Sequence, residues 1–146
     1  MAIIYPSLKD AMDAHEQVIR IGGGLSGVKD VGQIESVLQH IQNDDYYPSF
    51  EEKLAHLCHS LCKFHCFNDG NKRTGLAVTV QMLEWNNCDY CVHAFIRNME
   101  NIVVAIAEDR ISKALLQAII AAHLYQTYDD NEELKLQVLD ALTKPI

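Results

Sequence analysis

The sequence lacks three features that would each assign it to a class of protein: long apolar runs, an excess of positive charge and strand patterns. No stretch of its 146 residues approaches the ~18 uninterrupted apolar residues of a membrane span. Its net charge is −8, whereas proteins that bind nucleic acids usually present a basic face. We therefore expect neither a membrane protein nor direct binding of nucleic acid.

A secretory pattern is also missing, because no charged segment followed by an apolar one stands at the N-terminus. The five cysteines are an odd number, which does not suit a framework of disulfides. We therefore expect reduced thiols and a cytoplasmic location. Apolar residues make up 49% of the chain, which is ordinary for a soluble globular domain.

Helical spacing of apolar residues accounts for most of the chain, so the predicted fold class is all-α. Ser7 and Ser49 each precede an acidic residue by three positions, a typical helix start. Residues 22–32 contain five glycines and predict a loop or short hairpin. Residues 90–95 are predicted to be a connector. The predicted helices cover residues 7–21, 30–41, 49–64, 71–85, 98–107, 112–125 and 130–142, and the fourth is expected to be central and buried.

The stretch FHCFNDGNKRTGL, residues 64–76, concentrates groups suited to phosphate chemistry. A turn at Gly70 followed by a helix presents free backbone N–H groups and a positive dipole end to an anion. Lys72 and Arg73 add two charges there. His65 is a candidate general base, and Asp69 a candidate ligand for a divalent metal carried by the phosphates. Together these groups predict a phosphoryl or nucleotidyl transferase.

Each of these residues also has a plain structural interpretation. His65 would be an ordinary core histidine, and Asp69 or Thr74 would simply cap the next helix. Asn71 would be a turn residue, a phosphate-binding amide, or both. Phe67 is interpreted as the apolar anchor that holds the loop on the core. The predicted phosphate-binding residues are Gly70, Asn71, Lys72, Arg73 and Thr74.

Residues 65–74 resemble the Fic/Doc signature H-x-F-x-(D/E)-(G/A)-N-x-R-(T/S), most closely its Doc (death-on-curing) branch. A second likeness to Doc-like proteins runs over residues 27–38, and the whole resemblance covers about residues 8–125. It implies a Fic fold, a helical bundle with a short glycine-rich β-flap. We assign residues 1–125 to a Fic/Doc-like domain and residues 126–146 to an acidic C-terminal helical extension.

Two positions depart from the AMP-transferring members that the motif resembles. Those proteins have Gly where this chain has Lys72, and a second Arg where it has Leu76. Both departures match the Doc branch, whose resemblance implies a kinase that transfers the γ-phosphoryl group of ATP, with Mg²⁺, to a Ser or Thr hydroxyl of a protein. The alternative is AMP transfer (AMPylation) on the same scaffold.

The resemblance also implies partners. In the family a glycine-bordered flap docks an extended segment of the target protein, and Gly27, Val28, Lys29 and Asp30 occupy that place here. The structural alternative is a mere helix connector. The inhibitory helix motif Ser/Thr-x-x-x-Glu-(Gly/Asn) has no clean match in this sequence. We therefore expect a separate antitoxin, as in a toxin–antitoxin pair, with a translation factor as the target that the family suggests.

A different class of function, a non-catalytic zinc or scaffold protein, rests on the cysteines. Cys58, Cys62 and Cys66 recur every four residues, and Cys88 and Cys91 form a C-x-x-C pair. With His56, His59 or His65 they would offer zinc ligands. However, the first three share a helix face with leucines, where cysteine acts as a small apolar residue, and the pair has no second pair at zinc-finger spacing.

Overall fold

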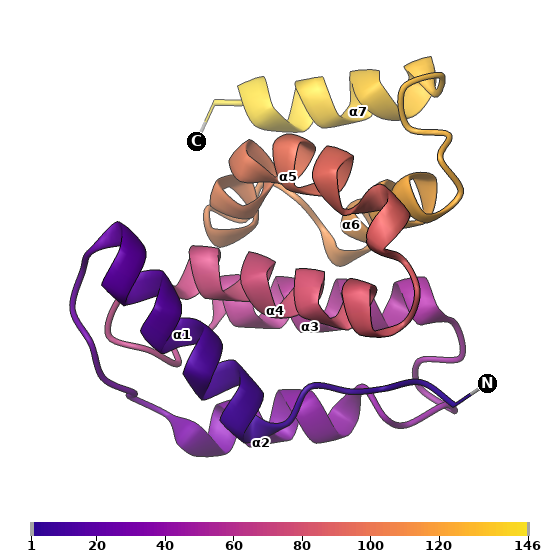
Figure 1. Cartoon of the computed structure of the whole chain (residues 1–146). Helices are drawn as coiled ribbons and strands as arrows, with labels where there is room; N and C mark the ends of the chain where they lie inside the picture. The colour runs from indigo at the N-terminus through magenta and orange to yellow at the C-terminus, as the bar shows by residue number, and fades with distance from the viewer. Residues whose placement is uncertain (1, 146) are drawn as a thin grey trace.

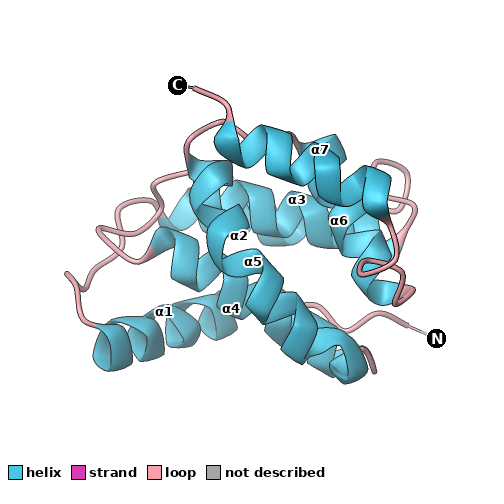
Figure 2. Ribbon diagram, turned by 90° about the horizontal axis from the view of Figure 1, so that it is seen from above, coloured by secondary structure: helices cyan, strands magenta, loops and turns pink. Residues whose placement is uncertain are grey.

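The computed structural model describes residues 2–145 as a bundle of seven α-helices and one short 3₁₀ helix, η1 (Figures 1 and 2). No strand forms within these residues. The predicted all-α fold class is therefore confirmed. The elements are α1 (Leu8–Gly22), α2 (Val31–His40), α3 (Phe50–Lys63), α4 (Asn71–Trp85), η1 (Asp89–Cys91), α5 (Val92–Ala107), α6 (Lys113–Leu124) and α7 (Glu132–Thr143).

Local capping explains where most helices begin. Ser7 and Ser49 form complete capping boxes with Asp10 and Glu52, so the predicted starts of α1 and α3 are confirmed. The side chain of Asp30 accepts from the Gln33 N–H at the start of α2. The starts of α6 and α7 are capped in the same way, by Ser112 and Asn131.

The antiparallel pair α3–α4 occupies the middle of the bundle (Figure 1). Helix α1 packs on α4, while α2 and α6 pack on α3; α5 contacts both central helices. The predicted central helix α4 therefore shares this place with α3. The largest fully buried apolar side chains come from α2 to α5 and from the residues that follow α2 and α3: Ile34, Ile41, Leu54, Leu57, Leu61, Phe67, Met82, Leu83, Phe95, Met99 and Ile102.

The prediction that residues 90–95 form a connector is wrong. Asp89–Cys91 form η1, and α5 begins directly after it at Val92. Phe95 lies one helical turn before Met99, and both side chains are 0% exposed. Because burial against the core outweighs the weak helix propensity of aromatic and β-branched residues, this segment joins the helix.

The C-terminal helix α7 packs across α5 and α6 (Figure 1). Leu134 and Val138 are each 5% exposed, and Leu142 is partly buried beside them. The predicted helix over residues 130–142 is thereby confirmed, with α7 spanning Glu132–Thr143. Among residues 2–145, no helix combines the length and the apolar character needed to cross a membrane.

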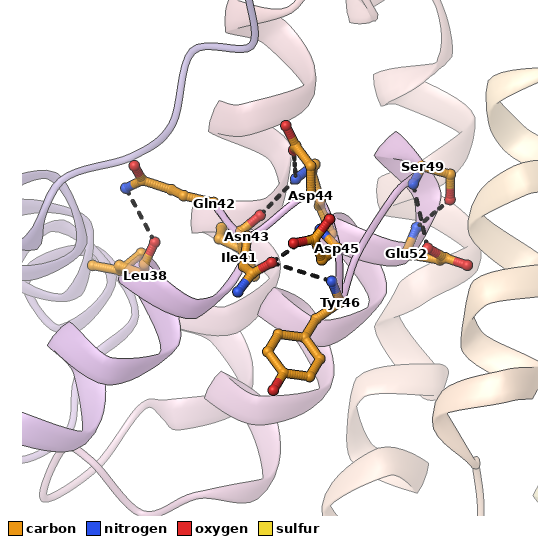
Figure 3. A network of polar contacts seen from close by, with 10 residues as sticks. Leu38, Ile41, Gln42, Asn43, Asp44, Asp45, Tyr46, Ser49 and Glu52 are labelled. Carbon is orange, nitrogen blue, oxygen red and sulfur yellow. Dashed lines mark hydrogen bonds and ion pairs between the residues drawn. The ribbon is translucent and has the colours of Figure 1, made fainter.

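The connection between α2 and α3 is held by its own polar groups (Figure 3). The Asn43 Oδ1 atom accepts from the backbone N–H groups of Asp45 and Tyr46, at 2.9 and 3.2 Å. The buried Lys53 ammonium donates to the Ile41 carbonyl at 2.9 Å and to the Asp44 carboxylate at 2.7 Å. This end of the bundle therefore satisfies its polar groups without a ligand.

Candidate active site

The signature residues form the connection between α3 and α4 and the first turn of α4. Gly70 is the N-cap of α4 with φ 75° and ψ 21°, a left-handed conformation that glycine adopts without steric cost. No side chain caps this helix start. The first backbone N–H groups of α4 therefore point out of the helix without an intrahelical acceptor. Because Gly70 is the N-cap, the alternatives in which Asp69 or Thr74 caps α4 are wrong.

Both cations of the motif lie in this first turn and are exposed. The first turn contains no acidic residue, so the positive dipole end and the side chains of Lys72 and Arg73 act together. A depression of about 330 Å³ opens beside them. Its lining brings together six residues of the predicted site and three further residues. The lining residues are Cys62, His65, Asn68, Asp69, Gly70, Asn71, Lys72, Arg73 and Ala107.

His65 lies just after the C-cap of α3, on the rim of this depression. Its side chain is exposed, so the alternative of a buried core histidine is wrong. An imidazole in this place can take a proton from a hydroxyl that enters the depression, since histidine exchanges protons near neutral pH.

The Asp69 carboxylate is oriented by two backbone donors. Oδ2 accepts from the Leu25 N–H at 3.1 Å, and Oδ1 accepts from the Gly70 N–H at 2.8 Å. These bonds, followed by the charges of Arg73 and Lys72, lower the pKa of Asp69 below its usual value. The carboxylate is therefore ionised at neutral pH.

An ionised carboxylate fits the divalent metal expected here. Mg²⁺ prefers oxygen ligands and commonly binds through one or two carboxylates, waters and substrate phosphates. No group of three His, Cys, Asp or Glu side chains within residues 2–145 could hold a metal ion. Asp69 would therefore hold a magnesium ion together with the oxygens of a bound nucleotide.

The side chain of Asn71 hydrogen-bonds to the backbone of Phe67 and thereby fixes the loop between α3 and α4. The Asn71 side chain accepts from the Phe67 N–H at 3.0 Å and donates to the Phe67 carbonyl at 3.1 Å. The Phe67 ring is 1% exposed, in the place expected of an apolar anchor. These two bonds engage the side-chain oxygen and one of the two Nδ2 hydrogens of Asn71, so its side chain fixes the loop, while its backbone N–H belongs to the open first turn of α4.

Arg73 and Thr74 differ from the other predicted phosphate-binding residues. The Arg73 guanidinium donates to the Gly23 carbonyl at 3.1 Å and to the Val18 carbonyl at 3.4 Å, at the C-terminal end of α1. Thr74 is 0% exposed and does not line the depression. The predicted contact between Thr74 and a phosphate therefore has no support in this structure.

His15, on α1, belongs to the site although the motif does not contain it. Its Nε2 donates to the Asp69 carbonyl at 2.8 Å, and its ring stacks on Phe67 with centroids 4.0 Å apart. The side chain is 3% exposed. The signal in the sequence was a histidine among the apolar positions of the first helix, which predicts a buried polar group that needs a partner.

The predicted flap is not a hairpin. Residues 23–30 form a loop whose one regular pairing is an isolated antiparallel bridge between Val28 and Phe67. The N–H groups of Lys29 and Asp30 both donate to the Cys66 carbonyl, at 2.8 and 3.0 Å. Gly32, at the end of the predicted stretch, lies inside α2. The expected docking segment thus runs along the motif itself.

The zinc alternative gains no support from the cysteines. Cys58, Cys62 and Cys66 are buried, and burial raises the pKa of the Cys66 thiol to about 11. Zinc binds the thiolate rather than the thiol. Within residues 2–145, no three His, Cys, Asp or Glu side chains come together as ligands for a zinc ion.

Comparison with models of known protein families relates the chain to one of them. Residues 5–83 match the Fic/DOC family, a range that runs from the segment before α1 to the last turns of α4. A search of curated proteins found no match. The matched range contains every residue of the candidate site except Ala107.

Proposed function

The chain belongs to the Fic/DOC family, and we propose that it transfers the γ-phosphoryl group of ATP to a Ser or Thr hydroxyl of a target protein. Members of this family are typically transferases that act on proteins and use ATP as substrate, usually with a divalent metal. The observation that carries the proposal is the uncapped start of α4, where Lys72 and Arg73 face the same depression as His65.

Each group has a separate role in the proposed reaction. The N–H groups of the first turn of α4 and the Lys72 ammonium hold the phosphates. His65 takes the proton of the attacking hydroxyl. A bond forms from that oxygen to the γ-phosphorus while the bond from the γ-phosphorus to the bridging oxygen breaks, and ADP leaves. When bound through Asp69, magnesium would neutralise charge on the phosphate oxygens.

Two positions favour phosphoryl over adenylyl transfer. Leu76, where the AMP-transferring members have a second Arg, packs against the hydrophobic core and offers no charge to a phosphate. Lys72, where they have Gly, lines the depression with an exposed cationic side chain. AMP transfer is the second candidate, because His65, Asp69 and Arg73 suit either reaction.

The proposed setting is a toxin that is controlled by a separate antitoxin and acts on a translation factor. This setting rests on the Doc-like motif. In self-inhibited members of the family, the Glu of the inhibitory helix pairs with the second Arg of the motif. This chain has Leu76 at that position, so such a Glu would have no arginine to pair with.

Incubation of the protein with ATP labelled at either the γ- or the α-phosphate, in a cell extract, separates the two reactions. We expect target protein to be labelled from γ-labelled ATP, and His65→Ala to lower the rate by ~10²–10⁴-fold, the usual contribution of a general base. His93→Ala, which changes an exposed histidine on α5, is the matched control. Label from the α-position alone would establish AMP transfer, and full activity of His65→Ala would contradict both reactions.

A further inference from the structure

Three glycines in the segment before α2 lie directly against side chains of the motif. A Cβ atom at Gly22 would collide with Arg73 Nη1, and one at Gly27 would collide with Asn68 Nδ2. A Cβ atom at Gly24 would lie 2.6 Å from Asp69 Oδ2. The glycine-rich segment is therefore shaped around the motif, with one glycine facing each of three side chains.

The contact with Asp69 is the closest to the proposed chemistry. The same Oδ2 atom that faces Gly24 accepts the Leu25 N–H at 3.1 Å. The absence of a side chain at residue 24 thus makes room for the carboxylate, and the N–H of residue 25 fixes its direction. The adjoining residues carry the pairing with the motif, since the Asn68 N–H donates to the Gly27 carbonyl at 3.1 Å.

We propose that Gly24 and Leu25 position the Asp69 carboxylate for the divalent cation that it holds with the nucleotide phosphates. The inference rests on the proposed function for the identity of that ligand. It adds that one backbone segment serves both the cation site and the expected target-docking stretch, Gly27 to Asp30. A target that draws this stretch away from the motif would also release the Leu25 N–H from Asp69 and weaken the cation site.

Two neighbouring glycines provide a matched pair of variants. Gly23 and Gly24 both have positive φ angles, 82° and 121°, so alanine strains the backbone at either position. A Cβ atom at Gly23 would meet nothing within 4 Å, whereas one at Gly24 would meet Asp69 Oδ2 at 2.6 Å and the Ile19 side chain at 3.2 Å. Ile19 has an apolar side chain that cannot bind a cation, so an effect of Gly24→Ala on the Mg²⁺-dependent part of ATP binding, beyond that of Gly23→Ala, reports on the carboxylate.

Calorimetric titration with ATP, with and without Mg²⁺, measures how much the cation contributes to nucleotide binding. We expect Gly24→Ala to reduce the gain in ATP affinity from Mg²⁺ by about tenfold, the effect of losing one hydrogen bond to a charged group. Gly23→Ala should leave this gain in affinity within about twofold of the wild type, because its Cβ atom would touch no other group. An equal reduction in both variants would overturn the proposal.

Hydrogen exchange of the Leu25 amide tests the positioning without any nucleotide. Asp69→Ala should speed this exchange, and Lys72→Ala, which leaves the carboxylate intact, should not. Unchanged exchange in Asp69→Ala would refute the contact. If the wild type fails to bind ATP under any condition, the proposed function falls, while the exchange result still decides whether the segment positions Asp69.

Discussion

The N-terminus of α3 is capped by side chains and that of α4 is not, although the two helices pack against each other at the centre of the bundle. At the start of α3, the Ser49 hydroxyl accepts from the Glu52 N–H at 3.2 Å, and the Glu52 carboxylate accepts from the Ser49 N–H at 3.3 Å. At the start of α4, Gly70 supplies no cap and the first turn carries two cations.

Electrostatics makes the difference informative. Acidic groups such as Glu51 and Glu52 stabilise a helix N-terminus, whereas cations there cost ~0.3–1 kcal/mol each. Helix α3 thus satisfies its own end and contributes to stability. Helix α4 leaves its first N–H groups without partners and adds positive charge, which is unfavourable at this end of a helix. A bound anion would pair with the N–H groups and with the cations, and would so turn an unfavourable arrangement into a favourable one.

The largest effect should come from removing a cation at the open end. Lys72→Ala should weaken ATP binding by ~10–100-fold, since a hydrogen bond to a charged group contributes ~1.5–3 kcal/mol. Its thermal stability should stay equal to that of the wild type or rise slightly, because the unfavourable charge at the dipole is gone. Calorimetric titration and thermal melting measure the two quantities.

Lys9→Ala is the control for this variant, because Lys9 is 83% exposed in the first turn of α1, far from the motif in sequence. It should leave ATP binding unchanged. Tight ATP binding by Lys72→Ala, equal to that of the wild type, would contradict the interpretation of α4 as an anion site.

His15→Phe should have the next largest effect. Phenylalanine keeps a ring to stack on Phe67 but cannot donate to the Asp69 carbonyl. We expect a loss of ~1–2 kcal/mol in the free energy of unfolding, together with weaker ATP binding because the loop before Gly70 is less fixed. Urea denaturation measures the first quantity and calorimetry the second.

The exposed His93 offers the matched substitution, since His93→Phe changes the same side chain on α5 without a buried partner. It should be close to wild type in both measurements. If His15→Phe lost stability but bound ATP normally, His15 would be a core residue alone and would not position the site.

Sequence reasoning predicted what is local and missed what is tertiary. The caps at Ser7, Asp30 and Ser49 and the motif are patterns of adjacent residues, so the helix starts followed directly. The roles of His15 and of the Arg73 guanidinium depend on α1 lying across the start of α4. Spacing within one segment carries no information about that crossing.

The first turn of α5 was missed for a related reason. Residues 90–95 are rich in aromatic and β-branched side chains, which favour other conformations locally. The burial of Phe95 in the core decides the outcome, and burial is a property of the assembled fold. The glycine-rich segment was correctly expected to need positive φ angles, but its close fit against the motif side chains appears only in three dimensions.

Ser49→Ala should affect the closed end alone. Removing this cap should lower the free energy of unfolding by ~1 kcal/mol and leave ATP binding within about twofold of the wild type. Urea denaturation measures the loss, and calorimetry checks the binding. Ser36→Ala, an exposed serine within α2 that caps no helix, is the control and should show little change. A loss of ATP affinity in Ser49→Ala would show that the two ends are not independent.

The smallest effect should be a loss of stability on acidification, and it should arise from α3 and not from the start of α4. Burial, followed by the charge of Lys113, lowers the pKa of His56 on α3 from 6.5 to about 4. The unfolded chain therefore binds more protons between these values, so stability is complete above pH 6.5 and falls as the pH drops toward 4. The Asp69 carboxylate beside α4, with its lowered pKa, stays ionised through this window.

Melting temperatures at pH 7 and pH 5 test this order of events. Since His56 is only partly buried, solvent screening keeps its contribution small, and His56→Gln should show a smaller drop between the two pH values than the wild type. His65→Ala, which removes an exposed histidine beside α4, should drop as the wild type does. If His56→Gln lost as much stability as the wild type, the acid sensitivity would not come from His56. It would then come from other groups, such as His59 on α3 and His123 on α6, whose pKa values burial also lowers.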